Sequence, residues 1–235
     1  IQDVHEGLRF CLSLPLDYPG ANRLVAHRFP PRLRPTVRDG RQARNWAAGE
    51  MFAGATDITN DDVMVIHSQY STQWDSLAHV GSVFDADGDG VPESVFYNGY
   101  RASSDIGPFP SGNGDEATEP APAGVNALGI ENMAKTAVQG RGVLIDLYRH
   151  FGRERTLVDH DALTRVREAD GVTVEEGDMV CFRTGFDELV LDMNRDPDTE
   201  ALQSSCAVLD GRDPKLLDWI TESGASVLIS DNFAV

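Results

Sequence analysis

The sequence lacks long apolar runs and carries a deficit of positive charge. No apolar stretch among its 235 residues approaches the ~20 residues that a membrane-spanning helix needs, so no membrane partner is expected. The chain has 20 Lys and Arg against 38 Asp and Glu, giving a net charge of −18. So large an acidic excess argues against nucleic acid and anionic membrane surfaces as partners. A hydrophobic fraction of 41% is nevertheless enough for one sizeable core.

Cysteine is also scarce. The three cysteines, Cys11, Cys181 and Cys206, are too few and odd in number for a disulfide framework, which predicts reduced thiols and a cytoplasmic location. None has a histidine partner in the local sequence, so none is predicted to be a nucleophile. No signal peptide is visible, although the chain begins at Ile1 without Met and a removed one stays open.

Residues 69–79 carry the most informative pattern. If this segment is extended, alternate side chains share a face. That face gathers two amides, a hydroxyl, a carboxylate and an imidazole, interrupted by Leu77 alone; they belong to Gln69, Gln73, Ser71, Asp75 and His79. If its end is helical, Asp75 and His79 are i,i+4 neighbours instead. The preceding apolar run, Val63–Ile66, predicts a buried strand, and Trp74 is predicted to lie in the core. The alternative is a polar turn in which Asp75 and His79 only form caps.

The segment resembles the signature of the cyclase family, His-x-Gly-Thr-His-x-Asp-x-Pro-x-His, found in kynurenine formamidases, isatin hydrolase and related metal-dependent hydrolases. Thr72, Asp75 and His79 match it, while Gln69 and Gln73 replace two histidines that bind metal in the family. The resemblance implies that Asp75 is a metal ligand and His79 the general acid/base. Mn²⁺, Zn²⁺ or Mg²⁺ is the expected ion, and the amide oxygens favour the harder ones or no metal at all. No organic cofactor is expected.

Further motifs resemble the family in the same order along the chain. They are Asn126–Glu131 with Gly140–Asp146, Glu176–Phe186, and Ser230–Asn232 after an expected strand. The resemblance implies a swivelling β/β/α fold, an α/β arrangement with a mixed sheet flanked by helices, in a single domain over 1–235. It also implies a homodimer or homotetramer. Family members continue to a further His and Glu, so the C-terminal part of the family domain is expected to be absent from this sequence.

The arrangement of expected elements is uneven along the chain. Residues 1–50 are predicted to form a strand at 8–14 and then a long irregular arm. The arm carries six arginines that are expected to contact acidic surface on the same or a neighbouring subunit: Arg28, Arg32, Arg34, Arg38, Arg41 and Arg44. Residues 103–125 predict a long surface loop. Helices are then expected at 130–138, 160–169 and 213–223, alternating with strands at 143–147, 179–183 and 226–229.

A second group of residues suggests a calcium-binding site. Asp85, Asp87 and Asp89, followed by Gly90, match the first half of an EF-hand loop. Its twelfth position is Phe96 rather than a bidentate Glu, which argues against a full EF-hand. A shorter, structural calcium loop and a solvated acidic hairpin tip are the two alternatives.

The resemblance to the cyclase family implies a hydrolase that cleaves an amide C–N, lactone or ester bond of a small molecule. His79 is the expected acid/base, with a divalent metal at Asp75 helped by Gln73 and Gln69. Three more residues are candidates to line the pocket, namely Thr72, Tyr97 and Asn98. His67 is a candidate replacement ligand, the alternative being a buried, hydrogen-bonded side chain. Two other functions stay open: a metal-free lyase or isomerase, and a non-catalytic protein that binds a ligand or calcium.

Overall fold

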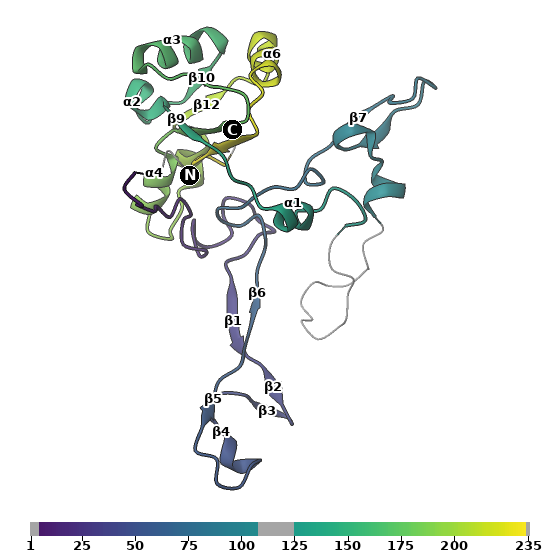
Figure 1. Cartoon of the computed structure of the whole chain (residues 1–235), viewed down its shortest axis with the longest axis vertical. Coiled ribbons are helices and arrows are strands. Elements are labelled where there is room, and N and C mark those ends of the chain that lie inside the picture. The colour runs from purple at the N-terminus through teal and green to yellow at the C-terminus, as the bar shows by residue number, and fades with distance from the viewer. Residues whose placement is uncertain (1–4, 108–124, 234–235) are drawn as a thin grey trace. The chain divides into compact units, whose positions relative to one another are not determined.

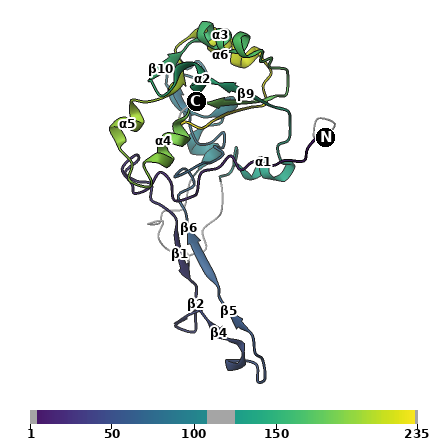
Figure 2. The same ribbon diagram turned by 90° about the vertical axis from the view of Figure 1, so that its left-hand side faces the viewer.

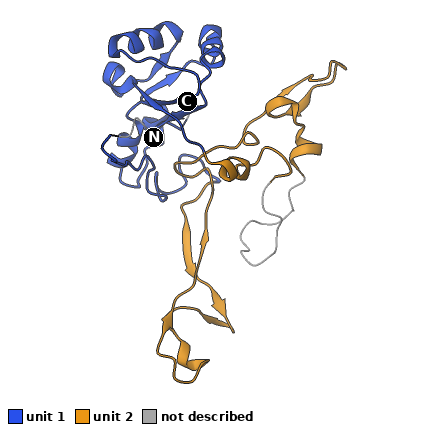
Figure 3. Ribbon diagram, viewed as in Figure 1, with its two compact units in different colours: residues 1–27, 138–235 blue, residues 28–137 orange. Residues whose placement is uncertain are grey.

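The computed structural model describes residues 5–107 and 125–233, which divide into two compact units (Figure 3). Unit 1 combines Ile1–His27 with Val138–Val235, and unit 2 is Arg28–Ala137. The helices and strands are labelled in Figure 1. Within the described residues, no helix has the length and apolarity needed to cross a membrane.

Unit 1 has parallel strands connected by helices (Figure 1). Its strands are β9 (Gly142–Asp146), β10 (Thr156–Val158), β11 (Met179–Arg183), β12 (Ala207–Leu209) and β13 (Val227–Ser230). Its helices are α2 (Leu147–Phe151), α3 (His160–Asp170), α4 (Phe186–Asp192), α5 (Thr199–Gln203) and α6 (Pro214–Glu222). The three-stranded sheet has the order β13-β11-β9, and β10 pairs with β12 in a separate parallel pair. The expected α/β alternation is confirmed.

Local sequence explains where these helices begin. The Asp159 carboxylate accepts a hydrogen bond from the Ala162 N–H at 2.8 Å, and Gly171 ends α3 in the left-handed conformation. Asp213 caps α6 in the same way, with Pro214 at its first position. The strands predicted at 143–147, 179–183 and 226–229 appear as β9, β11 and β13 with shifts of at most one residue.

The core of unit 1 forms where two helices cover the sheet. α3 and α6 lie against each other in both views (Figures 1 and 2). They bury Leu163 and Leu216 against alternate residues of the central strand, Val180 and Phe182. A second apolar cluster joins α4 and α5 to the N-terminal segment through Phe186, Leu202 and Tyr18, among others. Together these clusters hold β11 and the turn that follows it.

Unit 2 consists of two-stranded elements and short helical turns. Its strands are β1 (Arg32–Pro35), β2 (Val37–Arg38), β3 (Arg41–Gln42), β4 (Trp46–Ala47), β5 (Ile58–Thr59), β6 (Asp62–Val65), β7 (Ser82–Phe84) and β8 (Glu93–Val95). β1 pairs with β6, β2 with β3, β4 with β5 and β7 with β8, all antiparallel. Helical turns follow at Ala48–Glu50, Tyr97–Gly99, Ala102–Ile106 and α1 (Glu131–Thr136).

Two predictions about residues 1–50 are wrong. Residues 8–14 form no strand, because no neighbouring strand pairs with them, and Leu8, Phe10 and Leu12 are exposed. The arm is not irregular throughout, since β1 to β4 lie within it and pair with each other or with β5 and β6. The loop expected at 103–125 lies mostly outside the described residues, apart from the helical turn at Ala102–Ile106.

Candidate active site

Residues 69–79 follow β6 as a series of turns rather than as a strand or helix. The Tyr70 N–H donates to the His67 carbonyl at 3.0 Å, and the His79 N–H donates to the Ser76 carbonyl at 2.9 Å. The second turn folds the chain back, so that residues four apart become neighbours. The candidate acid/base is therefore positioned by a tight turn.

This turn brings Asp75 and His79 together. The Asp75 Oδ1 lies 3.8 Å from the His79 Nε2, and the two side chains are 46% and 29% exposed. An ion pair of this exposure contributes little to stability. A carboxylate next to an imidazole can instead fix the orientation of the ring and stabilise its protonated form during proton transfer. The turn thus makes the carboxylate and the imidazole neighbours, at a separation longer than a hydrogen bond.

The backbone of Gln69 is held by Arg28, one of the arm arginines that were expected to contact acidic surface. The Arg28 Nη1 donates to the Gln69 carbonyl at 2.8 Å, across 41 positions of the chain. Next to it, the rings of Phe29 and His67 pack with centroids 5.5 Å apart, and His67 is half-buried. No local pattern could have revealed this contact of Arg28, because it joins segments 41 positions apart on either side of the β1–β6 pair.

Two predictions of burial around this segment are wrong. Trp74 is 51% exposed, and Tyr70 is the aromatic residue that is buried. The run Val63–Ile66 includes most of β6, but Met64 and Ile66 are exposed. The physical reason is that, among the residues that the structure describes, β6 pairs with β1 alone, and a two-stranded sheet has little surface with which to bury side chains.

The remaining pocket candidates lie elsewhere in unit 2. Tyr97 and Asn98 form a helical turn after β8, where Asn98 adopts a left-handed conformation with φ of 56°. In the part of the chain that the structure describes, no hydrogen bond or ion pair joins either residue to Asp75 or His79. Thr72 and Gln73 are exposed, and Gln69 is half-buried.

The acidic segment forms the tip of the β7–β8 hairpin rather than a helix–loop–helix. Carboxylate oxygens of Asp85, Asp87 and Asp89 lie within 4.8 Å of one another. The Asp85 carboxylate accepts hydrogen bonds from backbone N–H groups of the tip. Arg101 contacts Asp87 at 2.7 Å and Glu93 at 3.1 Å, and its guanidinium lowers the pKa of Asp87. The tip therefore has calcium-like carboxylate spacing but already contains a competing cation.

In unit 1, the C-terminal motif contacts the strand motif that precedes it. The Asp231 carboxylate accepts hydrogen bonds from the N–H groups of Thr184 at 2.7 Å, Gly185 at 2.7 Å and Phe186 at 3.1 Å. Gly185 has φ of 78°, a conformation that glycine adopts without strain. The Asn232 amide donates to the Ala207 carbonyl at 3.2 Å. Motifs far apart in sequence thus form one hydrogen-bonded turn.

A second carboxyl group lies at this turn. Partial burial raises the pKa of Asp187, and a hydrogen bond to the neighbouring Asp231 raises it further. Burial raises the pKa values of the Cys181 and Cys206 thiols as well, which disfavours the reactive thiolates. All three cysteines are unpaired, in agreement with the expectation of free thiols.

Comparison with known proteins identifies the family that the order of the motifs indicates. The model of the Cyclase family matches residues 12–235. The chain belongs to the cyclase family. A solved structure described as a novel cyclase is similar over 95% of this chain, with 23% identity and a TM-score of 0.63. No curated protein matches the chain.

Membership in the cyclase family confirms the resemblance seen in the sequence and the α/β cyclase-like fold. The chain spans 64% of the length of the solved cyclase.

Proposed function

We propose that this cyclase-family member hydrolyses an amide C–N, lactone or ester bond of a small molecule, with His79 as the general acid/base. The observation that carries the proposal is the approach of Asp75 to His79, 3.8 Å apart, in the segment that matches the family signature. In this reaction His79 takes a proton from the attacking water. It then returns that proton to the leaving nitrogen or oxygen, while Asp75 orients the imidazole.

The available donors decide which metal would suit this site. Asp75 offers a carboxylate oxygen, and Gln73 and Gln69 offer amide oxygens in place of imidazoles. Such an oxygen set fits Mg²⁺ or Mn²⁺ and does not fit a zinc site rich in histidine. When bound, a divalent ion there would polarise the substrate carbonyl and lower the pKa of a bound water. Asp75, Gln73 and Gln69 would hold it.

The test of the proton-transfer role is His79→Ala. We expect hydrolysis of formamides, cyclic amides or lactones to fall by at least about 100-fold, because general acid/base catalysis typically supplies that much. The circular dichroism spectrum should stay unchanged, since His79 is largely outside the core. His27→Ala, at an exposed histidine of unit 1, is the control. Full activity of His79→Ala would contradict the mechanism.

Elemental analysis before and after chelation separates the alternatives. Mn²⁺ or Mg²⁺ lost together with activity supports the metal-assisted hydrolase. Activity that survives chelation favours a metal-free lyase or isomerase using the same two residues. If the protein binds calcium, loses it in the Asp85→Asn variant and turns over no substrate, the result favours a binding protein that uses the acidic hairpin tip.

A further inference from the structure

Arg28 joins the two chain segments at the base of the β1–β6 pair. Its Nη1 donates to the Gln69 carbonyl at 2.8 Å, and its side chain is half-buried. Within the pair, Arg32 lies opposite Val65. Continued from Arg32 back to Arg28 and from Val65 on to Gln69, the same register sets Arg28 opposite Gln69. The hydrogen bond therefore carries the alignment of the two strands as far as the first residue of the proposed site.

The proposed site itself is built from local turns. We use "signature segment" for residues 69–79. Backbone hydrogen bonds close one turn at Tyr70 and another at His79. They set the shape of each turn, including the 3.8 Å approach of Asp75 to His79, but not the place of the turns on unit 2. That place depends on contacts with residues outside the segment, such as the burial of Tyr70 and the bond from Arg28.

The chemistry of the Arg28 bond suits it to hold this place. A guanidinium stays protonated in proteins, and a hydrogen bond with a charged partner is about twice as strong as a neutral one. The acceptor is a backbone oxygen, so the bond fixes the main chain of Gln69. Gln69 occupies the first position of the family signature. Fixing its backbone therefore also fixes the point from which its side chain starts.

We propose that Arg28 is a positioning residue: it holds the signature segment at the base of the β1–β6 pair and thereby places Asp75 and His79 for proton transfer. The catalytic part of this inference rests on the proposed function, whereas the placement of the segment does not. Misplacing a catalytic group by about 1 Å can lower a rate by about 100-fold. Arg28 thus acts on the reaction through the backbone of the segment and not by contact with the substrate.

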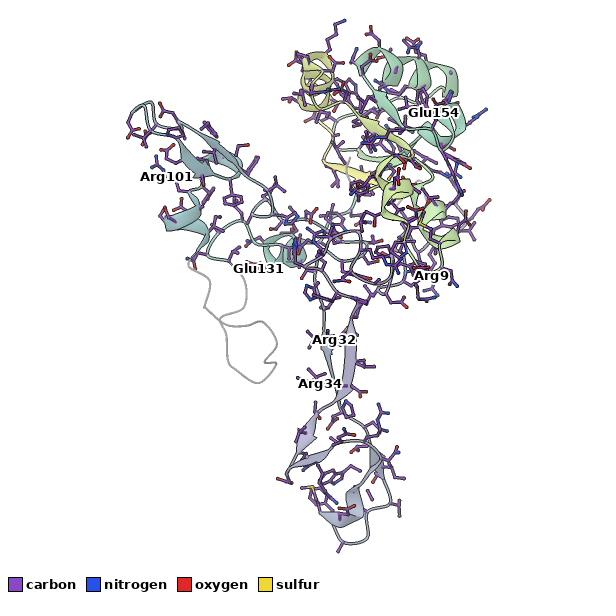
Figure 4. All side chains as sticks on the ribbon, turned by 180° about the vertical axis from the view of Figure 1, so that it is seen from behind. Arg9, Arg32, Arg34, Arg101, Glu131 and Glu154 are labelled. Atoms are coloured by element: carbon purple, nitrogen blue, oxygen red, sulfur yellow. The ribbon has the colours of Figure 1, made fainter. Side chains whose placement is uncertain are left out.

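Amide hydrogen exchange tests the placement without any substrate. In Arg28→Met, which keeps an apolar stem and removes the donor, the amides of the signature segment should exchange at least about tenfold faster than in wild type. A peptide that covers β9 in unit 1 should be unchanged. Arg34→Met is the matched control, because Arg34 lies on β1 (Figure 4), is exposed and is opposite Val63 within the pair. Arg28→Lys should come close to wild type, since its ammonium can still donate to the carbonyl.

Kinetics test the catalytic part, with a formamide, cyclic amide or lactone that the wild type hydrolyses. We expect the kcat of Arg28→Met to fall at least about tenfold while its KM changes less than about threefold. The reason is that a misplaced acid/base slows the chemical step more than it weakens binding. Arg28→Lys should restore most of the rate, and Arg34→Met should match wild type.

The outcomes distinguish this inference from the proposed function. Wild-type exchange of the signature segment in Arg28→Met would overturn the inference, as would an equal rise in every peptide of unit 2 or faster exchange with an unchanged kcat. Arg28→Gln, a polar variant too short to reach the carbonyl, takes the place of Arg28→Met if that variant does not fold. A wild type that hydrolyses none of these substrates, together with faster exchange in Arg28→Met, would contradict the proposed function and support the placement by Arg28.

Discussion

At the scale of single residues, an ion pair joins two of the family motifs in unit 1. Arg141, which precedes β9, contacts the buried Asp178, which precedes β11, through Nε at 2.8 Å and Nη2 at 2.7 Å. The Glu175 N–H also donates to Asp178. The Arg141 guanidinium, followed by the Glu175 N–H, lowers the pKa of Asp178 from 3.8 to about 2. The charged carboxylate is thus the form that the fold stabilises.

The depressed pKa of Asp178 predicts a contribution to acid stability. Its contribution is present above the unfolded-state pKa of 3.8 and is lost as the pH falls toward about 2. Asp178→Asn should therefore lower the melting temperature at pH 7, and the difference from wild type should shrink as the pH approaches 2. Melting followed by circular dichroism between these values checks it. Asp218→Asn, at an exposed position of α6, is the control and should behave like wild type.

The two residues proposed for catalysis, Asp75 and His79, depend on different contacts from those of Asp178. Asp75 and His79 are partly exposed, and their separation is set by one backbone hydrogen bond within the turn. Arg28 holds the first residue of the segment by a hydrogen bond to the Gln69 carbonyl. The site therefore depends on backbone turns more than on core packing, which is common for functional loops.

At the scale of elements, α3 shows how a cap and a buried face act together. Its Asp159 carboxylate satisfies the Ala162 N–H, and its Leu163 and Val166 are buried in the core of unit 1. The cap satisfies one of the N–H groups that the first turn leaves without a helical partner. The apolar face then holds the helix on the sheet.

Removing the cap tests its contribution. Asp159→Ala should lower the free energy of unfolding by about 1 kcal/mol, because the Ala162 N–H loses its acceptor. Asp159→Asn should retain most of the stability, since the amide oxygen can still accept the bond. Urea denaturation of both variants measures the difference. Equal stability of Asp159→Ala and wild type would contradict the role of the cap.

The longer elements of unit 1 were predictable from sequence, whereas most of the strand pairing in unit 2 was not. α3, α6, β9 and β11 follow from caps and from apolar runs of the right length, which are local signals. β10 and β12 are three residues each and α5 is five, too short for a clear periodic pattern. In unit 2, β6 was predicted as a strand at 63–66, although not as an exposed one. Its partner β1 was missed because the pairing joins segments about 30 positions apart.

At the scale of the whole molecule, the acidic excess dominates behaviour in solution. The net charge of −18 at pH 7 falls to zero near the isoelectric point of 4.5. Repulsion between molecules keeps a highly charged protein soluble, and its loss promotes association. We therefore expect the turbidity of a protein solution to be greatest close to pH 4.5. Added salt should change the turbidity little at that pH, because no net charge is left to screen. If the protein stays equally soluble from about pH 4 to about pH 7, this expectation is wrong.

The sequence by itself determined the family, the α/β alternation of residues 138–235 and the pairing of Asp75 with His79 as neighbours. These depend on motifs and on spacing of four residues or fewer. Only the tertiary structure decided that Asp231 binds the turn at Gly185, that Arg28 holds Gln69, and that Trp74 faces solvent. Each of these is set by which strands pair and which surfaces find a covering layer, and such long-range contacts leave no local periodicity in the sequence.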